Sequence, residues 1–459
     1  MRQREARAPC HPHAPILGQV GLGGIAAPAR SVPRRTQVII GLYGQQLALT
    51  AAASAADRAA LRRDVRVIGL VSSAHCLSHF FQLTLAPLFP LLKAEFAVGY
   101  ATLGALVSVF YVASGACQFA AGFAVDRFGA RPVLLGGIGL LASGALLAGF
   151  VPDVYWLFPL VALMGIGNGV FHPADFAVLN ANVEPRRLGH AYSMHGIGGS
   201  LGYALAPIVS YGIGSAFGWR TALFTLGAAG LAVLCAFALQ KDAFSSRAHA
   251  TAAPHPAPAR SLELFLQAPI LLCFAYFCVM TLGSIGIQTF AGTALNAAYA
   301  IPLGVATSAL AAYLLGSTAG ILSGGFLAAR TRHHDRVAAS GLAAGAALML
   351  LVGVAPAAAV LAVPLFAVTG FVLGTTGPSR DMIVRKATPS GASGRVYGFV
   401  YSGLDLGATI SPVALGALLD HGMPRAVFLA IAGCLFLAIA TVLQVRRRAS
   451  PRPAAVGAK

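Results

Sequence analysis

From Val65 onward, long apolar runs alternate along the chain with short polar connections. Each run has about 19 residues or more, the length that an α-helix needs to cross the ~30 Å hydrocarbon core of a bilayer. The pattern predicts an all-α membrane protein with twelve transmembrane helices, and an even number of crossings places both termini on one side. The predicted spans are 67–92, 101–124, 132–151, 155–180, 190–214, 219–240, 264–290, 303–328, 337–355, 358–384, 395–417 and 425–445.

The composition supports a membrane protein. Hydrophobic residues make up 57% of the 459 residues and charged residues only 10%, with a mean hydropathy of +0.75. A soluble protein of this composition would expose large apolar patches, and a disordered chain would need far fewer apolar residues. The 53 glycines allow helices to approach closely, which favours a helical bundle over an outer-membrane β-barrel.

The connection 241–262 is long, polar and rich in proline, and it divides the chain into six spans plus six. The two halves resemble each other at an offset of 205 residues. The matched pairs are Pro159/Pro364, Gly165/Gly370, Gly169/Gly374, Pro173/Pro378, Gly189/Gly394, Tyr192/Tyr397, Gly198/Gly403, Gly202/Gly407, Pro207/Pro412 and Arg220/Arg425. Six-helix repeats with a substrate path between them are typical of transporters.

The segments before and after the repeats are basic. We expect a disordered cytoplasmic extension (1–64), a first six-helix half (65–240), a cytoplasmic linker (241–262), a second half (263–445) and a cytoplasmic tail (446–459). Pro33-Arg34-Arg35 and the mildly apolar run after it weakly resemble a signal sequence. A dispensable tail, or a start codon assigned too early, is the interpretation that we favour.

The net charge of +18 does not indicate nucleic-acid binding, because no basic face alternates with aromatic residues. The arginines gather instead in the tails and in the connections on one side of the predicted bundle. The opposite connections hold only Lys93, Arg220 and Arg425. By the positive-inside rule, both termini are cytoplasmic.

No signature of soluble chemistry is present. The sequence has no phosphate-binding Walker loop, no nucleophile elbow and no His-Glu-x-x-His motif, so we expect neither an enzyme nor a bound cofactor. The seven cysteines (Cys10, Cys76, Cys117, Cys235, Cys273, Cys278, Cys434) lack metal-ligand spacing and lie mostly in apolar runs, which predicts no disulfide and no metal. Without an ATP-binding module, transport would have to use an ion gradient.

Three motifs carry a resemblance to a known family. Gly122-Phe-Ala-Val-Asp126-Arg127-Phe-Gly129-Ala-Arg131 resembles the loop signature between spans 2 and 3 of the major facilitator superfamily, and Gly198-Gly199-Ser-Leu-Gly202 resembles its span 5 motif. His75 with Ser78-His79, Pro90-Leu-Leu-Lys93-Ala-Glu95-Phe96 and Gly165-Ile-Gly167-Asn-Gly169-Val-Phe171-His172-Pro173 resemble the fosmidomycin resistance subfamily. An Asn-Asp pair of that subfamily is replaced here by Phe81-Gln82, so its drug specificity is not carried over.

The resemblance implies a bacterial inner-membrane transporter, monomeric, that works by rocker-type alternating access. It would export a small drug-like or toxic compound in exchange for protons, with spans 1, 4, 7 and 10 lining the cavity. Thr281, Ser284 and Gln288 fit the lining of span 7. Proton-coupled uptake of a metabolite is the alternative, and a non-transporting membrane sensor is a weaker one.

Polar side chains form two stripes at helical spacing. His75, Ser78, His79 and Gln82 share one face of span 1, and Asn168, Phe171, His172 and Asp175 share one face of span 4. Polar groups inside a membrane are costly and often functional, so both faces are expected to line one water-accessible cavity. The alternative is that each histidine only donates a hydrogen bond between packed helices.

Further charged residues lie away from the ends of predicted spans. The repeat places Asp175 on Arg380, and opposite charges there could form a latch between the halves or only set topology. Arg380 is followed by Asp381. Asp405 lies deeper, on a face with Tyr397 and Tyr401, and is the candidate for binding and releasing a proton. A structural Asp405, hydrogen-bonded to Tyr401 or Ser402, is the alternative.

Prolines and the loop signature suggest moving parts. Pro173, Pro207, Pro378 and Pro412 could act as helix hinges or be inert kinks. By resemblance, Gly122, Asp126, Arg127, Gly129 and Arg131 form a cytoplasmic gate in which Asp126 caps the N–H groups of a facing helix. The second copy has Thr331 in place of this aspartate, so a one-sided gate is expected; simple membrane anchoring is the alternative for each arginine.

Overall fold

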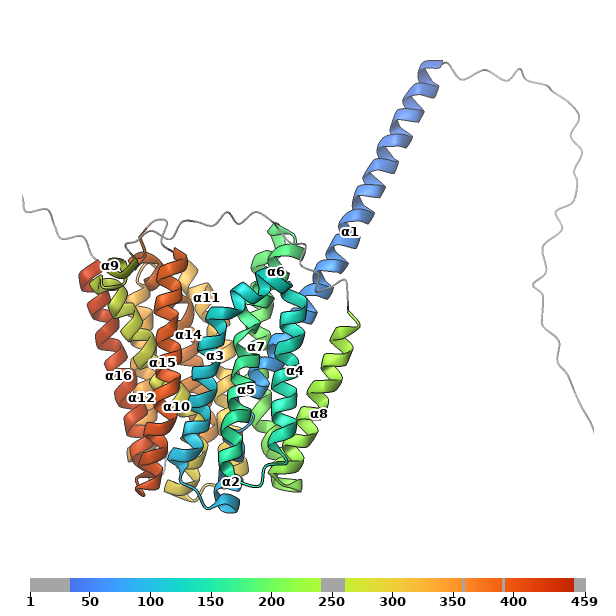
Figure 1. Ribbon diagram of the computed structural model, residues 1–459. Coiled ribbons are helices and arrows are strands. Elements are labelled where there is room, and N and C mark those ends of the chain that lie inside the picture. The colour runs from blue at the N-terminus through green and yellow to red at the C-terminus, as the bar shows by residue number, and fades with distance from the viewer. Residues whose placement is uncertain (1–33, 241–260, 357–359, 390–392, 450–459) are drawn as a thin grey trace, which may run out of the picture. The chain divides into compact units, whose positions relative to one another are not determined.

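The computed structural model describes residues 34–240, 261–356, 360–389 and 393–449, and the chain forms two units, Met1–Ala60 and Leu61–Lys459. All regular elements of the described residues are helical (Figure 1). The first half comprises α1 (Arg34–Gln82), η1 (Ala86–Leu88), α2 (Phe89–Phe96), α3 (Tyr100–Phe128), α4 (Ala130–Ala148), η2 (Val154–Trp156), α5 (Leu157–Gly169), α6 (Phe171–Asn182), η3 (Pro185–Arg187), α7 (Leu188–Phe217) and α8 (Trp219–Ala238). The second comprises α9 (Ser261–Phe265), α10 (Ala268–Tyr299), α11 (Leu303–Arg330), α12 (His334–Val354), α14 (Ala362–Ala387), α15 (Ser393–Asp420) and α16 (Pro424–Ala449).

The twelve-helix prediction is confirmed. Ten segments of the described chain are long and apolar enough to cross a membrane, with α5 and α6 together forming one of them. The part of α1 from Leu61 onward and α7 complete the set of twelve. The predicted linker 241–262 lies mostly outside the described residues.

Two predicted spans are interrupted where proline occurs. The first span, expected to reach residue 92, ends at Gln82, and Pro87 and Pro90 begin the separate helices η1 and α2. The fourth breaks at Val170, three residues before Pro173, because proline cannot donate the hydrogen bond that would continue the helix. Of the other expected hinges, Pro207 and Pro378 lie inside continuous helices, as does Pro412.

The expected disorder of residues 1–64 needs correction, because the chain is helical from Arg34. The alanine-rich sequence before Asp64 has a high helix propensity, which an apolar-run analysis does not weigh. The Asp64 side chain is fully buried and lies 2.9 Å from the Arg187 guanidinium, so it belongs to the folded first half. Residues 1–33 lie outside the described residues.

The matched glycines explain how each half packs. A Cβ atom on Gly165 or Gly169 would come within 2.3 or 2.4 Å of a backbone oxygen of α3. Their counterparts Gly370 and Gly374 would come within 1.9 and 2.2 Å of backbone oxygens of α11. Only glycine permits these contacts, and their repetition at equivalent helices shows that both halves use one packing design.

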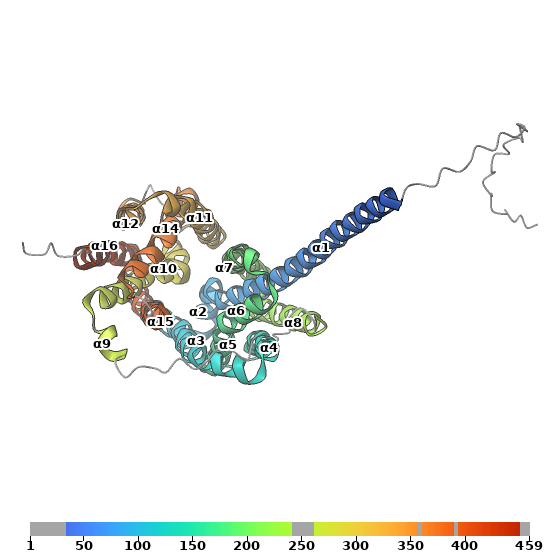
Figure 2. The same ribbon diagram turned by 90° about the horizontal axis from the view of Figure 1, so that it is seen from above.

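The halves meet along two seams, which Figure 2 shows from above. Helix α3 of the first half packs against α15 of the second, and α7 packs against α11. We call the end of the bundle that carries Asp420 and Tyr100 the Asp420 end, and the opposite end, which carries Arg127, the Arg127 end. The functional cavity lies between these seams.

Candidate functional site in the central cavity

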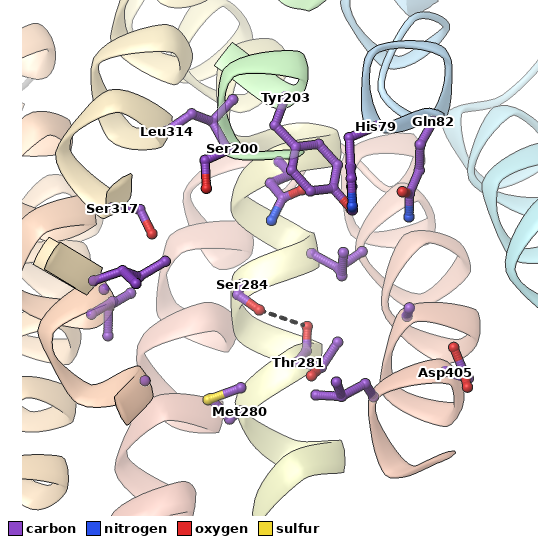
Figure 3. A pocket seen from close by; sticks show the side chains of 18 of the residues that line it. His79, Gln82, Ser200, Tyr203, Met280, Thr281, Ser284, Leu314, Ser317 and Asp405 are labelled. Atoms are coloured by element: carbon purple, nitrogen blue, oxygen red, sulfur yellow. Dashed lines mark hydrogen bonds between the residues drawn. The ribbon is translucent and has the colours of Figure 1, made fainter. Parts of the chain in front are cut away.

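A cavity of about 430 Å³ lies between the halves and is lined from both of them (Figure 3). Eight of the nine residues that the sequence predicted for the pathway line it: His75, His79, Gln82, Asn168, His172, Gln288, Arg380 and Asp405. The ninth, Asp175, is fully buried behind the wall. Thr281 and Ser284 also line the cavity, as expected for the face of α10.

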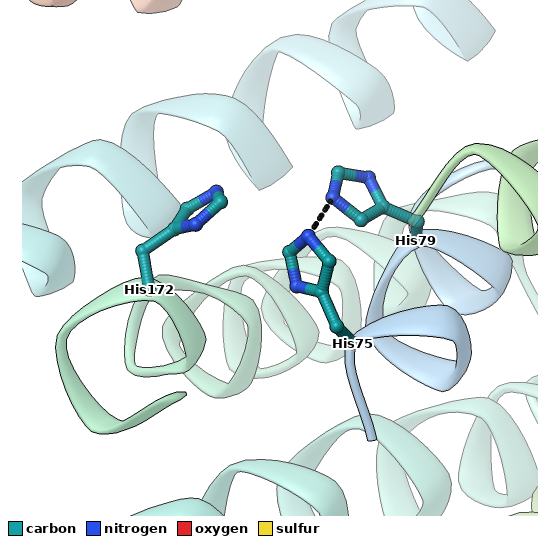
Figure 4. A group of neighbouring side chains, drawn as sticks. All are labelled: His75, His79 and His172. Carbon is teal, nitrogen blue, oxygen red and sulfur yellow. Dashed lines mark hydrogen bonds between the residues drawn. The ribbon is translucent and has the colours of Figure 1, made fainter. Parts of the chain in front are cut away.

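The wall of the first half is a cluster of histidines (Figure 4). Nε2 of His79 lies 3.0 Å from Nε2 of His75 on the preceding turn of α1. The His172 ring of α6 lies 5.0 Å from that of His75 and 6.3 Å from that of His79, between centroids. His195 of α7 stacks on His75 with a centroid separation of 3.6 Å.

Asp175 is the buried carboxyl group of this cluster. Its Oδ2 lies 3.0 Å from Nε2 of His195 and 3.4 Å from Nδ1 of His75. The suggested contact with Arg380 is not formed among the described residues, since Arg380 pairs with Asp381 of its own helix. The repeat offset aligned backbone positions correctly, but side-chain pairing follows the nearest partner in each half.

Sequence analysis missed His195, although its signal was present. His195 lies four residues before Gly199, on the same face of α7. A Cβ on Gly199 would come within 2.8 Å of the His79 ring and 2.9 Å of the His75 ring. The glycines of the span 5 motif therefore bring α7 against α1, and His195 meets the histidines there.

A hydrogen-bond chain fixes the polar wall further along the cavity. Asn168 of α5 donates to Ser78 of α1 at 2.7 Å and accepts from Ser114 of α3 at 2.8 Å. The asparagine side chain thus links three helices. Its donor and its acceptor are both paired, and burying either of them unpaired would be costly. Both stripes read from the sequence lie at this cavity.

The wall of the second half carries a fixed cation and a separate carboxylate. Arg380 Nε donates to Asp381 Oδ1 at 3.1 Å, and its guanidinium lies 4.7 Å from the Phe277 ring centroid. Tyr401 donates to Asp381 at 3.0 Å and not to Asp405. The Asp405 carboxylate is half-buried and has no side-chain hydrogen bond among the described residues, so the expected structural bond to Tyr401 or Ser402 is absent there.

The Asp420 end of the α3–α15 seam is tightly closed. Asp420 accepts hydrogen bonds from the backbone N–H groups of Tyr100 and Ala101, at 2.6 and 2.8 Å, and so caps the N-terminus of α3. Lys93 lies 3.7 Å from the same carboxylate. Behind this cap, Phe290 of α10 packs against Tyr100 with 5.9 Å between ring centroids.

The seam opens from this end toward the Arg127 end. A Cβ on Gly104 would come within 2.3 Å of the Pro412 carbonyl oxygen, and one on Gly115 within 3.4 Å of the Asp405 side chain. At Gly122 no atom of the described residues lies within 4 Å. Asp126, expected to cap a facing helix, is exposed and forms no side-chain contact in the described chain, whereas Arg131 donates to the Ala238 carbonyl at 2.7 Å.

Comparison with known proteins agrees with this architecture. A family model described as Major Facilitator Superfamily matches residues 71–379 and 287–459. The fosmidomycin resistance protein of Escherichia coli K12 is 24% identical over 410 residues, which cover 86% of this chain and 95% of that protein. A multidrug resistance protein B homolog of Mycobacterium tuberculosis is 35% identical over 100 residues, 22% of this chain and 18% of that protein.

Solved structures share the fold at low identity. A mutant of the nucleoside transporter NupG has a TM-score of 0.67 at 16% identity, covering 83% of this chain and 99% of that one. A bacterial homolog of the human lysosomal transporter Spinster, in an inward-facing and unoccupied conformation, has a TM-score of 0.65 at 14% identity, with 84% and 95% covered. These likenesses extend over nearly the whole twelve-helix bundle.

Proposed function

The chain belongs to the Major Facilitator Superfamily and is a multi-pass membrane transporter; from this premise we propose that it couples proton entry to the export of a small organic compound. The observation that carries the proposal is the cavity between the halves, closed at the Asp420 end and open at the Arg127 end of the α3–α15 seam. One open and one closed end is the arrangement that alternating access requires.

Charge supports placing the Arg127 end in the cytoplasm. Two of the three Lys and Arg residues at the Asp420 end are held in local ion pairs: Lys93 pairs with Asp420, and Arg220 pairs with Glu95, while Arg425 lies over the Tyr299 ring. The other end carries more arginines. By the positive-inside rule, that end and both termini therefore face the cytoplasm. The described conformation is then inward-open.

Proton coupling is assigned to Asp405. This carboxylate faces the cavity, lies beside Gly115 where the seam begins to open, and has no hydrogen-bond partner among the described residues. A carboxylate in the cavity can exchange protons with water whenever the cavity is open to one side of the membrane. Asp381 is a weaker candidate because its carboxylate is already bound by Arg380 and Tyr401. Asp175 is shielded from the cavity and is the second candidate.

The lining supports a small polar substrate. Imidazole, hydroxyl and amide groups line the cavity, and both halves contribute to this polar lining. Arg380 adds a permanently charged guanidinium, whose planar set of N–H donors can bind a carboxylate or a phosphonate. Relatives named for fosmidomycin and multidrug resistance favour export of a toxic compound. Uptake of an anionic metabolite is the alternative, because alternating access runs in both directions.

Transport by the purified protein in liposomes tests the proposal. An imposed pH gradient should drive accumulation of a substrate against its own gradient, and a deletion strain should become hypersensitive to that substrate. Gradient-driven transport with lost growth on a nutrient would indicate uptake. A transport rate that does not depend on the pH gradient would rule out proton coupling.

A further inference from the structure

His75, His79 and His172 have a geometry that the transport scheme does not use. One nitrogen from each ring can be chosen so that all three lie within 4.8 Å of one another. All three side chains line the cavity, and His172 is exposed to it. The rings converge from two helices, α1 and α6, as Figure 4 shows.

The sequence builds this convergence in two steps. His75 and His79 are four residues apart on α1, which is the spacing at which two histidines on one helical face bind a single zinc ion. Their Nε2 atoms lie 3.0 Å apart, close to the ~3.3 Å that separates two ligands of a tetrahedral zinc site. The break at Val170 places His172 in the first turn of α6, facing the pair.

A carboxylate lies behind the cluster. Asp175 Oδ2 is 3.4 Å from Nδ1 of His75, the ring nitrogen that faces away from His79, and it is tied to His195 at 3.0 Å. Metal-bound histidines almost always donate their second ring N–H to a carboxylate, a backbone carbonyl or water, which fixes the ring and raises its basicity. The buried Asp175 is thus placed to orient His75 without reaching the cavity.

Hydrogen bonding within the protein leaves this cluster incomplete. Nδ1 of His75, Nδ1 of His79 and Oδ1 of Asp175 are buried and have no hydrogen-bond partner among the residues that the structure describes. The two facing Nε2 atoms can share only one proton, so one of them must act as acceptor. A cation bound by both nitrogens would satisfy the two lone pairs together.

We propose that His75, His79 and His172 bind one divalent transition-metal ion, zinc foremost, with a fourth coordination position open to the cavity. Three neutral imidazoles and one open position form a ligand set that zinc accepts and that calcium or magnesium, which prefer oxygen, do not. Asp175 and His195 act as positioning residues behind it. This site replaces the expectation of no metal, which rested on cysteine spacing and did not consider histidines on different helices.

The test uses full-length protein purified without a histidine tag, in detergent, so that it depends on neither direction nor coupling of transport. Cobalt(II) titration should give the visible absorption bands of a four-coordinate site with three nitrogen ligands and one water, and zinc should displace cobalt with one ion bound per chain. Zinc X-ray absorption should report about three imidazole ligands at about 2.0 Å. Absence of binding by the wild-type chain overturns the proposal, as does a coordination shell made of oxygen only.

Single variants locate the site. His75→Ala, His79→Ala and His172→Ala should each weaken zinc binding at least about tenfold, and Asp175→Asn should weaken it by roughly 10- to 100-fold while the three imidazoles remain. His421→Ala, an exposed histidine at the Asp420 end, is the matched control and should bind normally. Loss of zinc in His195→Ala with normal binding in His79→Ala and His172→Ala would overturn the assignment in favour of the buried His75, Asp175 and His195 group.

Discussion

The two ends of the α3–α15 seam are built from the same two helices but behave differently. At the Asp420 end, backbone approaches backbone: a Cβ on Gly416 would come within 2.5 Å of the Tyr100 carbonyl oxygen, and Ser108 donates to the Thr409 carbonyl. At the Arg127 end, a Cβ on Gly122 would meet no atom of the described residues within 4 Å. The seam therefore opens progressively along α3.

The capping carboxylate of this structure is not the one that the sequence predicted. Sequence motifs assigned the capping carboxylate to Asp126, yet in this conformation Asp420 caps α3 at the opposite end. A cap made of two N–H bonds and one nearby lysine is strong enough to bias a conformational equilibrium and weak enough to break during transport. The loop motif predicts a corresponding cap by Asp126 when the other end closes.

The largest effect is expected at Asp405, which lies where the seam begins to open. Asp405→Asn removes a carboxylate that faces the cavity and has no hydrogen-bond partner in the described part of the chain, so the variant should lose pH-gradient-driven transport while still binding substrate and exchanging it across the membrane. Counterflow and gradient-driven uptake in the same liposomes separate these activities. Normal gradient-driven transport in the variant would move the proton site to Asp175 or to the histidines.

The next largest effect is expected from overpacking the closed end. Gly104→Val would place a side chain 2.3 Å from the Pro412 carbonyl and should destabilise the inward-open state by about 1–3 kcal/mol. The measurement uses a chain without other cysteines, in which Ser284→Cys places a single cysteine in the cavity. The rate at which a membrane-impermeant maleimide labels this cysteine is measured from each side of the membrane. Gly122→Val is the matched control and should leave labelling unchanged; equal effects of both substitutions would contradict an asymmetric seam.

Removing the cap should have a smaller effect of the same sign. Asp420→Asn keeps the shape of the side chain but replaces one of its two acceptor oxygens by an NH2 donor and removes the charge near Lys93. The expected shift toward the outward-open state is about 0.5–2 kcal/mol, as for the loss of a helix N-cap. The same labelling assay measures it, and a population unchanged by Asp420→Asn would show that the seam is closed by helix packing instead.

The sequence predicted most of the fold because hydropathy records helix crossings directly and glycine repeats record close contacts. It also placed His75, His79 and His172 at the cavity, since helical spacing defines which residues share a face. It did not predict the partners of Asp175, because His195 reaches it from α7 through tertiary packing. Nor could it predict which end is closed, since one sequence must be compatible with both states.

The smallest effect is expected at Asp126. This residue is exposed and unpaired among the described residues, so Asp126→Asn should change the stability of the inward-open state by less than about 0.5 kcal/mol. If Asp126 caps a facing helix only when the Arg127 end closes, the substitution destabilises the outward-open state instead. Cytoplasmic-side labelling of Ser284→Cys should then rise slightly, and periplasmic-side labelling should fall. Combined with Asp420→Asn, which acts on the opposite state, the substitution should restore labelling toward wild type, because the two losses shift one equilibrium in opposite directions. Shifts of the same sign in both single variants would show that the two carboxylates do not act as alternating caps.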